Sequence, residues 1–252
     1  MAYFRRRPLN GGTMVAVIEI VLYVCVWALV LGGIGYVIWH TSDTLPFGFW
    51  QFWHIRGSLW EAVIGAWPIY LWGAGLTALV AFTRWNGYTA QPIHIFTKGF
   101  LVSLLAGVLE EIWYRWLIFF LAILMIPVMD YLLLGFWGLH GIQWIYVAIL
   151  CPIANFFTLG YLEPYLLNGH GWAVSAAIIS ANGRFRNAHK YLGPFGYVNS
   201  WFLGVYFFWV MFNYGIVVAM IIHFLYDLFI FTVPAIDAVL ENRLQAVRRR
   251  RA

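Results

Sequence analysis

Apolar runs long enough to cross a lipid bilayer recur along this chain of 252 residues, and they restrict its possible folds more than any other feature. A membrane-spanning helix needs about 20 consecutive, mostly apolar residues. The composition agrees, because 63% of the residues are hydrophobic and 10% are charged, a balance that excludes a soluble globular domain. The sequence therefore predicts an all-α protein, a polytopic bundle of membrane helices.

Charged residues, glycine and proline interrupt the apolar runs and set the boundaries of the expected spans. The second span should be kinked near Pro68. The sixth is short, so it is either re-entrant or continues past Asn182 and Gly183. About eight transmembrane helices are expected, with six as the alternative. These spans are Met14–Ile38, Leu59–Phe82, Phe100–Pro127, Tyr131–Leu150, Pro152–Leu167, Gly171–Ala181, Ser200–Phe212 and Ile216–Val233.

The net charge of +5 lies largely at the two ends of the chain, in Arg5–Arg7 and Arg248–Arg251. Basic residues beside membrane spans are typical of the cytoplasmic side, so these clusters indicate topology, and no nucleic-acid partner is expected. We expect one membrane-embedded domain over residues 1–252. Residues 1–12 form its basic cytoplasmic leader and residues 237–252 its basic cytoplasmic tail.

Three charged residues lie together in the middle of the third apolar run: Glu110, Glu111 and Arg115. A charge at the centre of a membrane helix costs roughly 2.5–3.5 kcal/mol on insertion scales, so such residues usually face the protein interior. On a helix, Glu111 and Arg115 are four residues apart and can form an ion pair. Glu110 points to a different flank. We therefore expect a structural Glu111–Arg115 pair beside a Glu110 carboxylate that is free for chemistry.

Two histidines accompany this cluster in later membrane segments. His223 and Asp227 are four residues apart in the last apolar run and share one helix face. An aspartate that only satisfies a buried histidine is one interpretation, but an ionisable pair inside a membrane helix usually marks a functional site. His189 follows Phe185 by four residues among basic residues, and taken alone it is equally compatible with an interfacial loop.

The three motifs occur in the order of a known family. They resemble those of the CPBP family, which comprises CAAX prenyl endopeptidases and bacteriocin-processing or self-immunity membrane proteins and is also called the ABI family. The resemblance extends over about Leu101 to Phe231. The motifs are Glu110-Glu111-x-x-x-Arg115, Phe185-x-x-x-His189 and His223-x-x-x-Asp227.

The resemblance implies a glutamic intramembrane protease, an integral protein of a bacterial plasma membrane with eight helices and both termini in the cytoplasm. In that family the residues matching Glu110 and His189 activate a water molecule. The residues matching His223 and Asp227 form the oxyanion site, and Glu111 and Arg115 have supporting roles.

One residue departs from the well-studied relatives, which have an amide where this chain has Asp227. An ionised carboxylate would repel an oxyanion. We therefore expect Asp227 to orient His223 and favour its protonated form, or to be neutral itself.

Other functions stay open at this stage. A Zn²⁺ ion could accept Glu110, His189, His223 and Asp227 as ligands, but the chain has no HExxH motif, and no cofactor is expected. The charged residues could instead hold together a non-catalytic immunity or scaffold protein. A solute carrier would show inverted repeats, and none is visible. The expected partners are a peptide or membrane-protein substrate, prenylated or not, and membrane lipids.

Overall fold

The computed structural model describes residues 45–83, 91–167 and 169–251, together with the isolated positions Cys25, Gly32, Gly33 and Tyr36. The chain divides into two compact units, Met1–Leu45 and Pro46–Ala252. The predicted span Met14–Ile38 falls in the first unit and, apart from the isolated positions, lies outside the described residues. The single domain expected over residues 1–252 stays a prediction.

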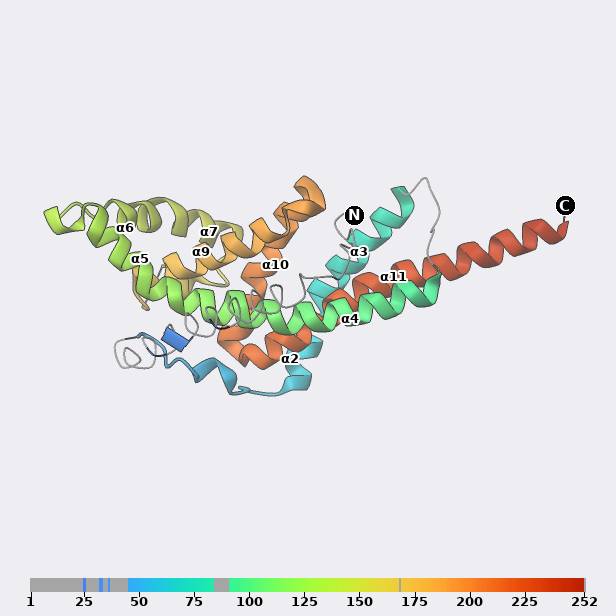
Figure 1. The fold of residues 1–252 in the computed structure, drawn as a ribbon, viewed down its shortest axis with the longest axis horizontal. Coiled ribbons are helices and arrows are strands. Elements are labelled where there is room, and N and C mark those ends of the chain that lie inside the picture. The colour runs from blue at the N-terminus through green and yellow to red at the C-terminus, as the bar shows by residue number, and fades with distance from the viewer. Residues whose placement is uncertain are drawn as a thin grey trace, which may run out of the picture. The chain divides into compact units, whose positions relative to one another are not determined.

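All regular elements in the described residues of Pro46–Ala252 are helical, so the all-α fold class is confirmed for this part of the chain (Figure 1). In chain order they are η2 (Gln51–Trp53), α2 (Leu59–Gly65), α3 (Trp67–Thr83), α4 (Pro92–Glu110), η3 (Glu111–Ile118), α5 (Phe119–Leu133), η4 (Gly135–Trp137), α6 (Gly141–Ile145), η5 (Tyr146–Leu150), α7 (Cys151–Phe157), α8 (Glu163–Leu166), α9 (Trp172–Ala188), η6 (Lys190–Leu192), α10 (Gly193–Tyr214) and α11 (Ile216–Arg251).

Three helices of the described residues are long and apolar enough to cross a membrane: Pro92–Leu133, Lys190–Tyr214 and Ile216–Asn242. The helices α2 and α3 make a fourth span if they are counted together, since they meet at a 40° bend. This bend lies beside Pro68, where a kink was expected. The described residues alone therefore do not reach the expected count of about eight.

Two predicted spans have the wrong boundaries, Tyr131–Leu150 and Pro152–Leu167. The helix before them continues to Leu133, and the next apolar helix is Gly141–Phe157. The cause is Asp130, whose buried carboxylate accepts hydrogen bonds from the backbone N–H groups that start α6. The donors are Ile142 at 2.9 Å, Gln143 at 3.0 Å and the His140 ring at 2.7 Å. Capping by a distant acid has no local sequence pattern.

For the later helices, the predicted boundaries agree better with the structure. The short segment that begins at Gly171 continues past Asn182 and Gly183 as α9, the second of the two expected outcomes. The break between the last two spans is confirmed at Gly215. This residue has φ +99°, and a Cβ there would lie 2.5 Å from the His54 carbonyl oxygen, so the turn requires glycine.

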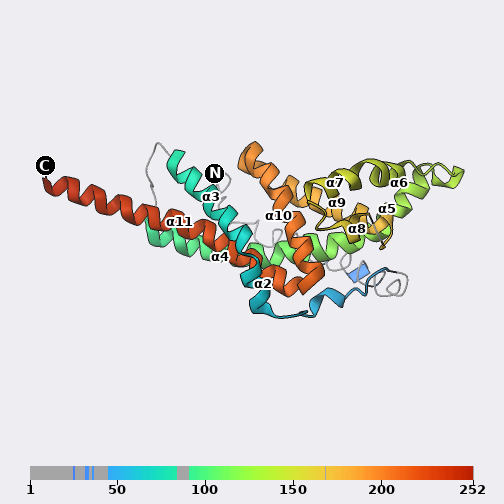
Figure 2. The same ribbon diagram turned by 180° about the vertical axis from the view of Figure 1, so that it is seen from behind.

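The helices α4 and α11 lie side by side in both views of the chain (Figures 1 and 2). Their close approach depends on small residues at every fourth position of α4, namely Gly99, Ser103 and Gly107, all of them buried. A Cβ on Gly107 would lie 2.9 Å from both the Met220 carbonyl oxygen and the Phe224 nitrogen. Small residues at this spacing allow membrane helices to pack backbone to backbone. This packing brings the end of α4 against the first turns of α11.

An aromatic core supports the segment that follows α4. Phe47, Phe49 and Phe52 come from the loop before α2 and pack against rings of α5 and α10. Trp116 stacks on Phe49 at 4.4 Å and donates its ring N–H to the Phe49 carbonyl oxygen at 2.8 Å. Trp53, from the same segment, also contacts the Trp116 ring, at 5.1 Å between centroids. The loop therefore holds η3 in place.

Replacing Gly107 by leucine should separate α4 from α11, because the new side chain would meet backbone atoms. Overpacking of this kind costs about 1–3 kcal/mol of folding free energy. Thermal unfolding of the purified protein in detergent should show a lower midpoint for Gly107→Leu than for the unchanged protein. Gly75→Leu is the matched control, since nothing lies within 4 Å of a Cβ built on Gly75. Equal midpoints for both variants would contradict the close contact.

Candidate active site

The helix that contains the three central charges is not a regular α-helix. Between α4 and α5 it widens into the π-helical turn η3, which begins at Glu111 and includes Arg115. Single π-helical turns inside α-helices are frequent at functional sites. The turn directs Glu111, Arg115 and Trp116 into the protein, where all three are buried. No residue pattern in Glu111–Ile118 predicts this widening.

Glu111 and Arg115 form the expected ion pair. The Arg115 Nη1 lies 3.2 Å from Glu111 Oε1, and both side chains are 0% exposed. The guanidinium lies 3.9 Å from the Phe185 ring centroid and 5.3 Å from that of Phe207. Its nitrogens have no hydrogen-bond partner of good geometry in the described residues. The two aromatic faces therefore add a smaller attraction to that of the Glu111 carboxylate.

His223 is held by Glu111 and not by Asp227. Its Nδ1 lies 2.7 Å from Glu111 Oε1, a hydrogen bond in which the ring N–H donates to the carboxylate. Its ring stacks on Phe207 at 4.4 Å. The expected His223–Asp227 pair is present, but the shorter contact belongs to Glu111, so the orienting role expected of Asp227 stays a prediction. Asp227 Oδ2 is 3.6 Å from the other ring nitrogen, Nε2.

His189 directly follows the last residue of α9, and its ring faces the charged cluster. Its Nδ1 lies 2.8 Å from the Phe185 carbonyl oxygen, which can only accept a hydrogen bond, so Nδ1 carries a proton. The ring is also in contact with the Phe185 ring, at 4.6 Å between centroids. Its Nε2 is directed at Glu110, at 3.7 Å from Oε2. An exposed loop histidine would not be fixed in this way.

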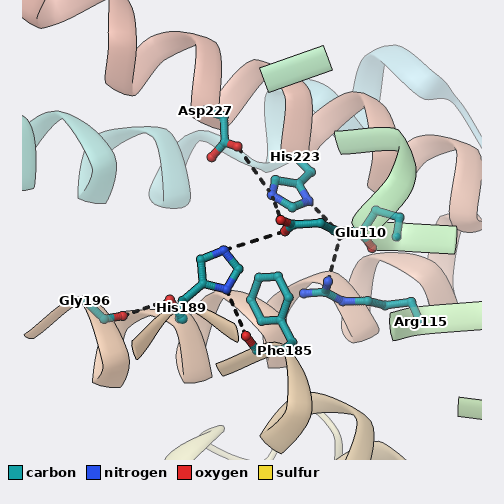
Figure 3. A network of polar contacts seen from close by, with 9 residues as sticks. Glu110, Arg115, Phe185, His189, Gly196, His223 and Asp227 are labelled. Carbon is teal, nitrogen blue, oxygen red and sulfur yellow. Dashed lines mark hydrogen bonds and ion pairs between the residues drawn. The ribbon is translucent and has the colours of Figure 1, made fainter. Parts of the chain in front are cut away.

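Glu110 lies between the two imidazole rings, as Figure 3 shows. Its Oε2 is 3.7 Å from His189 Nε2 and 3.9 Å from His223 Nε2, and it has no hydrogen-bond partner in the described residues. The Glu110 side chain is 28% exposed, in contrast to 0% for Glu111. The neighbouring carboxylates thus differ in environment, although they are adjacent in sequence.

All six residues singled out from the sequence come together, and they form two layers. The inner layer is buried and consists of Glu111, Arg115 and His223. The outer layer consists of Glu110, His189 and Asp227, whose side chains are 28%, 16% and 24% exposed. The outer layer is partly exposed, although Glu110 Oε2 itself is buried, and the inner layer is closed to the surroundings.

Sequence reasoning missed one residue of the site, Phe207. It stacks on His223 and also lies beneath the Arg115 guanidinium. A phenylalanine in an apolar run has no distinguishing signal, so only the fold could reveal this role. Phe185, quoted as part of its motif, contacts both Arg115 and His189.

No group of three or more His, Cys, Asp or Glu side chains in the described residues is arranged to hold a metal ion. Comparisons with protein-family models, curated proteins and solved structures returned no match for this chain. The chemistry of the site is therefore inferred from its geometry and its residue types.

Removing Glu111 should destabilise the fold much more than removing Glu110. Truncating one partner of a buried ion pair costs about 3–5 kcal/mol, because the other charge stays buried without compensation. Glu111→Ala takes the carboxylate from both Arg115 and His223. Unfolding in detergent should show a large loss of stability for Glu111→Ala and a small change for Glu110→Ala. Similar losses for both would argue against the two-layer description.

Proposed function

We propose that this chain is a glutamic intramembrane endopeptidase that resembles the CPBP family. The observation that carries the proposal is the position of Glu110. This carboxylate, partly exposed and without a hydrogen-bond partner among the described residues, lies within 4 Å of two imidazole nitrogens contributed by distant helices. A base flanked by two proton-exchanging groups is suited to the hydrolysis of an amide bond.

The spacing around Glu110 suits activation of a water molecule. Distances of 3.7 Å and 3.9 Å are too long for direct hydrogen bonds, but one water can hydrogen-bond to the carboxylate and to a ring at once. Because His189 Nδ1 donates to a carbonyl, the neutral ring has its lone pair on Nε2 and can accept a proton. The water oxygen attacks the scissile carbonyl carbon, and its proton passes to Glu110 or His189. The same groups then return a proton to the leaving amine.

His223 is proposed to stabilise the negative charge on the tetrahedral intermediate. Since Nδ1–H donates to Glu111, donation from Nε2 requires the doubly protonated ring. Oxygens of three carboxylates, those of Glu110, Glu111 and Asp227, lie 2.7–3.9 Å from its ring nitrogens and can accept hydrogen bonds from a doubly protonated ring. An imidazolium is a stronger donor to an oxyanion than a neutral ring. In this proposal Asp227 contributes by stabilising a positive charge on the His223 ring.

The resemblance also supports finer expectations that belong to this proposal. These are an eight-helix bundle, a bacterial plasma membrane, cytoplasmic termini, and a peptide or membrane-anchored protein as substrate. The described residues supply three or four spans, and Met14–Ile38 is expected to add one. A non-catalytic immunity or scaffold protein is the alternative, and it would not require Glu110 to be reachable from outside.

Glu110→Gln should abolish cleavage and leave the fold intact, because the amide keeps the shape of the side chain but cannot accept the water proton. General-base catalysis contributes about 100-fold to 10,000-fold, so a loss of at least about 100-fold is expected. The measurement compares peptide termini in membranes of cells that express the unchanged protein or the variant. Glu61→Gln, an exposed carboxylate on α2, is the control and should change nothing. Identical peptide termini with a stable Glu110→Gln protein would favour the scaffold function.

The proposed chemistry uses only side chains, so activity should survive the removal of metal ions. Purified protein would be incubated with a strong chelator, passed through a desalting column and assayed on the substrate identified from the peptide termini. Unchanged activity is expected. Activity that is lost and then restored by Zn²⁺ alone would support the zinc-dependent alternative, in which Glu110 and the two histidines are ligands.

A further inference from the structure

A second feature lies on another face of α9. Phe185 and His189 face the candidate active site, whereas Ile179, Gly183 and Arg186 line a groove of about 450 Å³ between α7, α9 and α10. Figure 2 shows these three helices next to one another. The groove belongs to neither layer of the candidate site.

Most of the groove is apolar, and it opens to the surroundings of the protein. Its wall includes Ile153, Phe157, Val198 and Phe202, which are 49%, 51%, 54% and 43% exposed. Phe157 and Phe202 also line a neighbouring apolar cavity of about 520 Å³ that extends along α10 to Trp209. The two cavities share Phe157 and Phe202 as lining residues, so apolar surface continues from one to the other. Such a surface suits a hydrocarbon chain better than a polar metabolite.

One end of the groove is positively charged. The Arg186 guanidinium lies 4.4 Å from the centroid of the Tyr197 ring, and the Tyr197 hydroxyl donates to Asn187 Oδ1 at 2.9 Å. Arg186 Nη2 makes a longer hydrogen bond to the same oxygen, 3.3 Å. Its Nε is buried and has no hydrogen-bond partner in the described residues. None of the described residues lining the groove is acidic, so an oriented cation with a spare donor faces it.

The position along the chain fits the polar region of a membrane. Arg184 and Lys190 flank Arg186, and the candidate span Lys190–Tyr214 begins at the second of them. Basic residues at the end of a span meet lipid headgroups, and basic pockets between membrane helices bind anionic ones. The Arg186 guanidinium is therefore placed to meet a lipid phosphate, and the apolar wall is placed to contact an acyl chain.

We propose that this groove binds an anionic phospholipid of the surrounding bilayer, with its phosphate on Arg186 and an acyl chain along Phe157 and Phe202. A zwitterionic headgroup is disfavoured, because it brings its own cation next to the guanidinium. Bound lipid would also hold the end of α9, one turn from His189. The proposal does not rest on the hydrolase function, since lipid binding is measured directly.

The test uses the full chain, purified in neutral detergent and mixed with equal amounts of phosphatidylglycerol and phosphatidylcholine that have identical acyl chains. After detergent washing, retained lipid is quantified by mass spectrometry. The unchanged protein should retain phosphatidylglycerol over phosphatidylcholine by about fivefold, the ratio that corresponds to about 1 kcal/mol for one basic residue at a membrane surface. Arg186→Gln should bring this ratio to about one, and Arg184→Gln, on an exposed neighbour, should preserve it.

The apolar part of the groove is tested separately at Gly183. Nothing lies within 4 Å of a Cβ built there, so the position has room for a side chain; Gly183→Trp places a bulky ring at the groove, and Gly183→Ala is the control. The tryptophan variant should lose both lipids, and the alanine variant should retain them. The proposal is overturned if the unchanged protein shows no preference, if Arg184→Gln abolishes the preference as completely as Arg186→Gln, or if Gly183→Trp retains lipid normally.

Discussion

The Glu111 carboxylate is the interaction on which the candidate site depends. A single oxygen of this fully buried side chain meets both Arg115, at 3.2 Å, and His223, at 2.7 Å. It therefore joins the helix α4–η3–α5 to α11 in an environment where an unpaired charge would be very costly. The stacked rings of Phe185 and Phe207 close the same region. Without this junction, His223 would lose its short hydrogen bond and Arg115 would lose its buried counter-ion.

The difference between the two adjacent glutamates follows from this junction. Glu111 is used to compensate charges, so its oxygens are directed inward. Glu110 remains at the edge of the same cluster, near His189 and His223, and has no structural duty that competes with proton transfer. A protein that buried both carboxylates would need further cations. Because Glu111 alone pairs with both Arg115 and His223, the Glu110 carboxylate remains available for proton transfer.

Sequence patterns predict six residues of the candidate site, but neither Phe207 nor the contacts that assemble the site. The Glu111–Arg115 pair follows from helical spacing, and the pairing of His223 with a carboxylate follows from the cost of ionisable groups in lipid. Spacing along α11 predicts Asp227, which lies 3.6 Å from the ring, whereas packing of α4 on α11 brings in a closer partner, Glu111, at 2.7 Å. The boundary after Leu133 was missed for a related reason, since Asp130 caps a helix that begins eleven residues later. Contacts between distant segments decided each of these cases.

The π-helical turn has a consequence for how this chain can change. Its extra residue per turn is shared by eight positions from Glu111 to Ile118. A wide turn of this kind takes up one residue more than the α-helical turn it replaces, and the helix that follows keeps its register. Deleting one residue here would therefore let the backbone close to α-helical pitch without rotating α5. The change would fall on the inward directions of Glu111, Arg115 and Trp116.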